Sequence, residues 1–391
     1  MSGSHRYFVP DYYSDFRCKG SHCRSTCCHG WGVSISMKDY FRLLGMECSP
    51  ALRKKLDCAF HLVESPTTER YAQITPNWEG NCPMLQSDGY CQLQCECGEK
   101  ALPDICRYYP RGLHVDHLPE CSCSNSCEAV LELLFELDEP LGFHEEALNI
   151  DLPANSALTE RHYGEIRFHC IEVLQDRRYS LAQRLAHLGD MLAPLNDIFI
   201  SGDNAAIERE IAQWNGLEYS ELPNLDLPFA LHMPFVFAAY FEDNSLSLQP
   251  HIQALRKTLD LCAGFTPTDL QWSSIAARYQ ASVDHFSHLF PDWERLFEQM
   301  LVNHVFFERF PFSNNHENLW DEYRSLCAAY AFVRFLAVGW MNERTHLYDL
   351  VDVCAAAFRL IDHSNFDLNA VVLLNTQNFR SASDMIQMIQ L

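Results

Sequence analysis

The sequence predicts a mainly α-helical protein in two parts: a small loop-rich cysteine domain (residues 1–130) and a larger all-α domain (residues 131–391). Fourteen of the eighteen cysteines lie between Cys18 and Cys127. After that point apolar residues recur at helical spacing. The first part holds 13 Lys+Arg and 15 Asp+Glu, whereas the second holds 16 and 37. Because cysteine density, periodicity and charge all change between residues 127 and 140, we place the boundary at residue 130.

Helical spacing in the second part is clearest in three segments. The segment after Cys127 places apolar residues on one face before Pro140, namely Val130, Leu133, Leu134 and Leu137. Residues 292–312 repeat this pattern and stop at Pro311, and residues 321–341 are apolar nearly all round, which predicts a central helix. Further helices are predicted at 164–175, 180–193, 204–214, 252–263 and 346–361. In the first part we expect a short strand at 33–37 and a helix from Asp39.

Composition excludes several classes of function. The most apolar run, fifteen residues from Leu227, is too short for a membrane span and contains two prolines, so we expect no membrane insertion. No N-terminal segment resembles a secretory signal, and the predicted location is the cytoplasm. The net charge of −23, with Lys257 as the only lysine in the second part, argues against a nucleic-acid partner. A cationic partner would suit the acidic half, although acidity can also serve solubility alone.

The clustered cysteines raise a question of chemistry. Cys27 and Cys28 are adjacent, and neighbouring cysteines hardly form a relaxed disulfide with each other. In a reducing compartment metal ligation is favoured over a disulfide scaffold. The repeated C-x2-C spacing of zinc ribbons is absent, as is the radical-type C-x3-C-x2-C triplet, so the residues alone favour iron–sulfur over zinc only slightly. The scattered cysteines of the second part are expected to be buried apolar residues: Cys170, Cys262, Cys327 and Cys354.

One string carries a resemblance. Residues 16–31 read F-x-C-x-G-x2-C-x3-C-C-x-G-W, and "CPML…DGYC", "GEKALPDICRYYPRG", "EQMLVNHVFFERFPF" and "DEYRSLCAAYAFVRFL" follow. These motifs resemble the flagellin lysine-N-methylase family over most of the chain. The resemblance implies an iron–sulfur protein with one [4Fe–4S] cluster that methylates lysine side chains of flagellin, its partner, using S-adenosylmethionine.

The resemblance also implies which cysteines of this sequence bind the metal. The recurring cysteines correspond to Cys18, Cys23, Cys27, Cys28, Cys82, Cys91, Cys106 and Cys127, which are more than the four that one cubane needs. Glu128 stands where the family usually has proline. Cys95, Cys97, Cys121 and Cys123 look like additions. The surplus sulfurs leave a second metal or a structural role open.

Polar residues beside the cysteines supply candidates for methyl transfer. Arg111 is a candidate cofactor-binding residue that would clamp the donor's carboxylate, or alternatively a structural ion-pair partner. Tyr108 and Tyr109 would line a lysine channel and Glu99 would accept a proton, although packing and a solvated helix face are the ordinary roles of such residues. Trp31 is a candidate for cofactor binding or for the core.

Three further polar residues have ordinary alternatives. His29 is a conceivable metal ligand. Asn303 and His304 are candidates for the domain interface, with a core histidine favoured. No G-x-G-x-x-G string follows a strand, so an ordinary Rossmann methyl-donor site is not indicated. A non-catalytic, zinc- or iron-stabilised protein-binding module therefore remains the alternative function.

Overall fold

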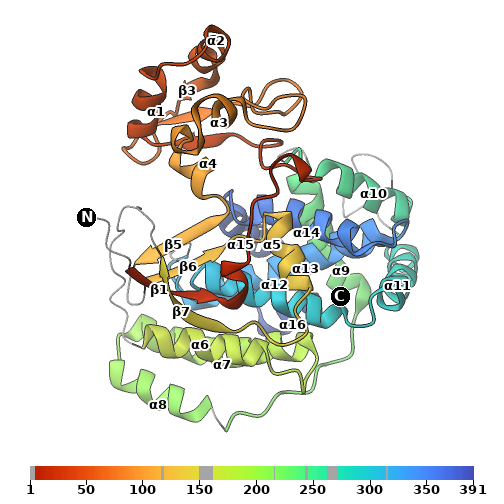
Figure 1. Ribbon diagram of the computed structural model, residues 1–391. Coiled ribbons are helices and arrows are strands. Elements are labelled where there is room, and N and C mark those ends of the chain that lie inside the picture. Colours follow the sequence, from red (N-terminus) through yellow and green to blue (C-terminus); the bar gives the residue numbers. More distant parts are fainter. Residues whose placement is uncertain are drawn as a thin grey trace.

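A computed structural model describes residues 5–115, 119–148, 162–214, 216–242, 245–261, 271–313 and 316–391. These residues form sixteen α-helices and seven short β-strands. The mainly α-helical fold, with a small strand-containing N-terminal region and a larger helical body, is confirmed (Figure 1).

The helical body is built around α13 (Leu319–Met341), whose side chains are buried along nearly its whole length. Its first turn is capped by the Asn318 side chain, which accepts a hydrogen bond from the Asp321 backbone N–H at 2.8 Å. The predicted central helix is therefore confirmed. The helices around it are α6 (Tyr163–Leu174), α7 (Leu181–Ser201), α8 (Asn204–Trp214), α9 (Leu227–Phe241), α10 (Gln249–Leu259), α11 (Trp272–Leu289), α12 (Trp293–Phe307), α14 (Leu347–Ile361), α15 (Phe366–Thr376) and α16 (Ala382–Ile389).

A four-stranded sheet joins the N-terminus to this body. Its strand order is β5 (Arg111–Val115), β6 (Pro119–Cys123), β1 (His5–Pro10) and β7 (Phe143–Leu148), with β1 parallel to β6 and antiparallel to β7. Phe8 on β1 contacts the Phe306 ring of α12 at 6.1 Å between centroids. The first strand and η1 (Asp11–Ser14) thus pack in the larger core. The division at residue 130 stays a prediction, and the packing adds that the larger core also draws on the first sixteen residues.

The cysteine-rich residues fold mostly as a separate small unit with its own core. In Figure 1 this unit projects from the helical body, above β5 and β6. It contains the three-stranded sheet β2–β4–β3 (Val33–Ile35, Ala72–Ile74, Phe60–Leu62), flanked by α1 (Met37–Leu44), α2 (Pro50–Ala59), α3 (Gln92–Cys97) and α4 (Asp104–Tyr108). Ile35, Leu43 and Leu52 lie at the centre of its apolar cluster. The predicted strand and helix at 33–44 are confirmed.

Two helices continue through an internal proline. The helix predicted at 180–193 therefore ends too early in the prediction, directly before Pro194. Helix α7 continues past Pro194 to Ser201, and α9 contains Pro234. Proline removes one hydrogen bond of the helix ladder, but the neighbouring side chains are buried and hold each helix in place. Helices α2, α3 and α4 of the cysteine unit, and α9, α11, α15 and α16 of the helical body, were not predicted. Among the described residues, no helix combines the length and apolar character that a membrane crossing requires.

Candidate metal centre

Backbone contacts bring Cys28 next to the second group of cysteines along the chain, which runs from Cys82 to Cys106. The backbone N–H of Cys82 donates to the carbonyl of Cys28 at 2.8 Å. Leu85 and Cys91 then form an isolated β-bridge, which closes the loop between Cys82 and Cys91 around the tight turn at Gly89. Gly89 has φ +84°, a conformation that favours glycine. The loop therefore returns Cys91 to the neighbourhood of Cys28.

Four of the predicted ligands share one environment. Burial, with smaller contributions from the charges of Cys28 and Cys91, raises the pKa of the Cys82 thiol to about 12. Burial also raises the pKa of Cys106, with added repulsion from Cys28, Cys82 and Cys91. The sulfurs of Cys28, Cys82, Cys91 and Cys106 thus lie close enough to repel one another as thiolates. We call them the inner four.

The other four predicted ligands form a second group at the start of α5 (Glu128–Phe135). Burial, with smaller contributions from the charges of Glu128, Cys127 and Cys18, raises the pKa of Cys23 to about 12. Burial raises the pKa of Cys127 to about 11, with Cys18 again contributing. The pKa of Cys27 is raised first by its hydrogen bond with Cys28 and by burial, and then by the charges of Cys28, Cys106 and Cys127, so Cys27 borders both groups. We call Cys18, Cys23, Cys27 and Cys127 the outer four.

The adjacent pair Cys27–Cys28 joins the two groups. A hydrogen bond from the Cys27 thiol lowers the pKa of Cys28 to about 7, while the same bond raises the pKa of Cys27. The Arg359 guanidinium also favours the Cys28 thiolate. Gly30, with φ +92°, makes the turn that follows. Through this adjacent pair the inner four and the outer four form one continuous group of eight cysteines, which we call the sulfur zone.

The donor set fits a thiolate-bound metal centre. The seventeen cysteines that the structure describes form no disulfide. Cys28, Cys82 and Cys91 are partly buried and Cys106 is exposed, and each of the four opposes the ionisation of the others. A cation would stabilise such thiols as thiolates, because coordination deprotonates them outright. Zinc takes four thiolates in this way, and so does an iron–sulfur cluster. The residue types do not choose between the two.

Glu128, the first residue of α5, binds the loop that carries Cys18 to Cys28, which we call the opening loop. Its carboxylate is 1% exposed and accepts hydrogen bonds from Lys19 Nζ at 2.6 Å, from the Arg24 N–H at 3.1 Å and from the Ser25 N–H at 2.8 Å. Glu132, one turn later, contacts only the side chains of Lys19 and Arg24. The residue that departs from the family's proline is therefore the anchor of this loop.

We expect Glu128→Gln to loosen the loop by about 2–3 kcal/mol, since hydrogen bonds to charged groups are worth about this much. Limited trypsin digestion should then cut faster at Arg17, Lys19 and Arg24, with the helical circular dichroism unchanged. Glu132→Gln is the matched control, because it removes a carboxylate from the same cations without releasing backbone N–H groups. Equal cleavage rates in the two variants would show that Glu128 is not the anchor.

A chain of polar contacts leads from the sulfurs into the helical body. The Trp31 indole N–H donates to the Cys27 carbonyl at 2.6 Å, and the Trp31 ring packs against the His363 ring at 4.5 Å between centroids. His363 Nε2 lies 2.8 Å from Ser126 Oγ, which also bonds the Tyr109 hydroxyl at 2.9 Å. Ser126 in turn contacts Ser124 Oγ at 2.6 Å. Trp31 and the "CSCSNSC" segment thus connect the cysteines to the helical body.

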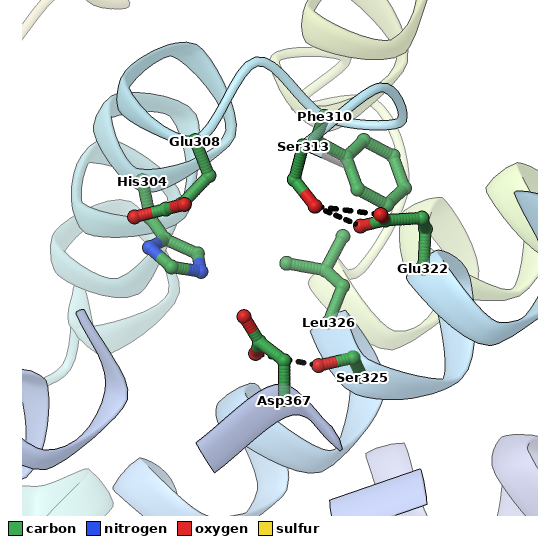
Figure 2. Close-up of a pocket in the computed structure, with 8 residues that line it drawn as sticks. All are labelled: His304, Glu308, Phe310, Ser313, Glu322, Ser325, Leu326 and Asp367. Carbon is green, nitrogen blue, oxygen red and sulfur yellow. Dashed lines mark hydrogen bonds between the residues drawn. The ribbon is translucent and has the colours of Figure 1, made fainter. Parts of the chain in front are cut away.

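The chain ends in a buried acidic pocket on α12. Ser124 Oγ donates to Asp362 Oδ2 at 2.5 Å. Burial by itself lowers the pKa of His304, but the Asp362 carboxylate at 3.2 Å raises it to about 9. Burial raises the pKa of Glu308 to about 8, with the charge of Asp362 adding to it. Figure 2 shows His304 and Glu308 side by side on the wall of this pocket, facing Asp367.

Not all of the residues predicted for catalysis or cofactor binding contact the eight cysteines. Trp31 contacts Cys27 directly, as described. The Arg111 guanidinium lies over the Phe16 ring at 4.8 Å and favours ionisation of Cys121 and Cys123 in the larger core. Glu99 is exposed, and Tyr108 packs beneath Arg107. In the described part of the chain, neither Tyr108 nor Glu99 hydrogen-bonds to one of the eight cysteines.

Other predicted positions can be located as well. His29 contacts Asn81 through Nδ1 at 2.9 Å. Asn303 does face the cysteine half, because its amide donates to the Cys123 carbonyl at 2.8 Å. Cysteines outside the sulfur zone include Cys95 and Cys97 on α3, and the buried Cys121, Cys123, Cys170, Cys327 and Cys354. Cys262 lies outside the described residues.

Sequence reasoning missed Ser124, Ser126, Asp362 and His363. The serines of "CSCSNSC" alternate with cysteines, and this regular spacing was the available signal. Asp362 and His363 directly follow α14 and carry no motif, so only packing reveals them.

Comparisons with known proteins identify the family of this chain. Residues 167–388 match the family model described as "FliB lysine N-methylase C-terminal domain". The lysine-N-methylases of Salmonella choleraesuis and Salmonella typhimurium are each 23% identical to this chain, over 364 and 362 residues, and the matches cover 86% of both chains in each pair. The flagellar biosynthetic protein FliU of Salmonella muenchen is 29% identical over 106 residues, 27% of this chain and 62% of FliU. No solved structure matches the chain significantly. Since the family model covers more than half of its length, this chain belongs to the FliB lysine N-methylase family.

Proposed function

We propose that this protein methylates lysine side chains of flagellin, with S-adenosylmethionine as methyl donor and a [4Fe–4S] cluster beside the reaction site. Family membership supports lysine methylation. The flagellar name of the FliU relative supports a flagellar substrate. The observation that carries the proposal is the grouping of the eight cysteines beside Trp31, Tyr109 and His363: the Trp31 indole donates to the Cys27 carbonyl, and Tyr109 lies within reach of the charges of Cys127 and Cys27.

We assign the cluster to Cys28, Cys82, Cys91 and Cys106. These four sulfurs come from both cysteine blocks and act on one another's ionisation, as the four ligands of a single cluster must. When bound, such a cluster could hold the amino and carboxylate groups of the donor through iron. The outer four would then support the loop that carries Cys28 or bind a second metal.

The reaction places specific demands on this chain's own residues. A neutral lysine amine attacks the donor's methyl group, forming the N–C bond as the S–C bond breaks and the sulfide leaves. The amine must lose its proton first, and a desolvated channel lowers the pKa of lysine. The rings of Trp31 and Tyr109 pack edge to face at 5.7 Å between centroids, beside Cys27, and are suited to line that channel. The roles assigned to Arg111, Tyr108 and Glu99 stay predictions.

The acidic helical half suits a lysine-bearing substrate. Residues 131–391 contain 37 Asp+Glu against 16 Lys+Arg. Opposite charge speeds association and is screened by salt. We therefore propose that this half docks flagellin.

The test is methylation of purified flagellin by protein isolated without oxygen, with S-adenosylmethionine added and lysine methylation read by mass spectrometry of peptides. We expect methylated lysines only when both donor and iron-loaded protein are present. Visible absorbance and iron analysis of the same sample distinguish an iron–sulfur protein from a zinc protein. A folded, metal-loaded protein that leaves flagellin unmodified would favour the non-catalytic binding module.

A further inference from the structure

A buried arginine of the helical body lies beside the cysteines without a carboxylate partner. Arg359, in the last turn of α14, is 5% exposed. Within the described residues its partners are two backbone carbonyls and the ring of Trp31, although a buried charge is ordinarily paired with an opposite one. Of the other buried arginines in the described ranges, three form ion pairs with carboxylates and one lies over the Trp293 ring at 3.6 Å, in this order: Arg167, Arg184, Arg324 and Arg334. Arg359 therefore needs a counter-ion of another kind.

The two carbonyls belong to the two segments that carry the outer cysteines. Arg359 donates through Nη2 to the Ser25 carbonyl of the opening loop, and through Nε to the Ser126 carbonyl at 3.4 Å. Ser25 lies two residues before Cys27, and Ser126 directly precedes Cys127. These contacts hold the guanidinium where the opening loop meets the start of α5.

The positive charge of Arg359 acts on the sulfur zone. The guanidinium carbon lies 5.9 Å from the centre of the Trp31 ring, whose indole N–H donates to the Cys27 carbonyl at 2.6 Å. The pKa of Cys28 is lowered first by the hydrogen bond from Cys27 and then, after a hydrogen bond from Thr26, by the charge of Arg359. A guanidinium is not deprotonated in proteins, so this charge is permanent.

We propose that Arg359 is the counter-ion of the metal–thiolate centre in the sulfur zone. Four thiolates outweigh the charge of a zinc ion or of an iron–sulfur cluster, so the loaded centre is an anion. A fixed cation beside it stabilises the anion, and the anion supplies the opposite charge that Arg359 otherwise lacks. Arg359 acts through the thiolates and is not itself a ligand, because a guanidinium has no lone pair to offer. The inference rests on thiolate coordination of a metal, and neither on methyl transfer nor on the choice between iron and zinc.

Two substitutions separate this role from a purely structural one. If Arg359 only tied the Ser25 carbonyl to the Ser126 carbonyl, its hydrogen-bond geometry would matter and its charge would not. Glutamine offers N–H donors without a charge, whereas lysine offers the charge without the planar fork of donors. A counter-ion is therefore lost in Arg359→Gln and kept in Arg359→Lys.

The experiment measures how readily EDTA removes metal from the full-length protein purified without oxygen. After a fixed incubation, the iron and zinc that stay bound are counted by elemental analysis. Arg359→Gln should lose half of its metal at an EDTA concentration at least about tenfold lower than the wild type, because partners beyond the direct ligands contribute this much to metal affinity. Arg359→Lys should stay within about threefold of the wild type, since it keeps the charge.

Arg53→Gln is the matched control. Arg53 lies on α2 of the cysteine unit and also binds backbone carbonyls, those of Leu43 at 3.1 Å and Leu44 at 3.0 Å. It has its own counter-ion in Asp57 at 2.8 Å, unlike Arg359. This substitution removes a charge and two carbonyl contacts from the same unit, and metal retention should match the wild type.

Three outcomes would overturn the proposal: folded wild type that holds neither iron nor zinc, equal metal retention in Arg359→Gln and the wild type, or equal loss in Arg359→Lys and Arg359→Gln. Far-UV circular dichroism shows which variants are folded. If Arg359→Gln does not fold, Arg359→Lys decides by itself, because retained metal supports the proposal and a tenfold loss refutes it. A metal-loaded protein that leaves flagellin unmodified contradicts the proposed methyl transfer but not this inference.

Discussion

Replacing Cys28 by serine is expected to remove the metal and the activity together. Cys28 is the inner-four residue contributed by the opening loop, and its backbone carbonyl holds Cys82 at 2.8 Å. Iron should fall from about four atoms per chain, the content of one cubane, to below about one. Solubility should fall with it, because a small loop-rich unit depends on its metal for folding. Iron analysis, visible absorbance and flagellin methylation measure the three effects.

Two matched variants make this result interpretable. Cys58→Ser changes an exposed cysteine on α2, outside both groups of four, and should keep full iron and activity. Cys23→Ser changes an outer-four residue and should retain the cluster if the inner four hold it. A soluble Cys28→Ser protein with full iron would refute the assignment, and iron loss in Cys23→Ser with none in Cys28→Ser would move the cluster to the outer four.

The largest change in stability is expected from Glu298→Gln. The Glu298 side chain is completely buried on α12 and contacts Arg177 at 2.9 Å and Arg184 at 2.6 Å. Arg184 is itself only 3% exposed. Removing one member of a buried ion pair leaves an uncompensated charge and costs about 3–5 kcal/mol. Urea unfolding followed by far-UV circular dichroism should show this loss as a lower midpoint.

Glu294→Gln is the control for this prediction. Glu294 lies one turn before Glu298 and approaches the same Arg184 at 3.8 Å, but its side chain is 36% exposed. Exposed pairs contribute about 0–1 kcal/mol, so the midpoint should hardly move. Similar midpoints for the two variants would mean that Glu298 is compensated by contacts other than its charge.

Local patterns predicted most of the helical body. The apolar spacing of 321–341 identified α13, and the helix expected from Asp39 corresponds to α1, which begins two residues earlier, at Met37, after the Ser36 cap. Predictions failed where tertiary packing outweighed local preference. Helix α9 holds Pro234, and burial of its neighbours maintains the helix that proline disfavours. In α7 the same competition extends the helix seven residues beyond Pro194.

The sequence by itself determined that the protein is mainly helical, that its cysteines concentrate in one region, and that its motifs resemble the methylase family. These features depend on neighbours within a few residues, so periodicity and spacing record them. Only the tertiary structure decided that Cys28 groups with Cys82, Cys91 and Cys106, and that Asp362 meets His304 beneath Ser124. Ser124 and Asp362 are 238 residues apart. Such contacts arise from the packing of whole helices against the cysteine unit, and no local pattern encodes which side chains then meet.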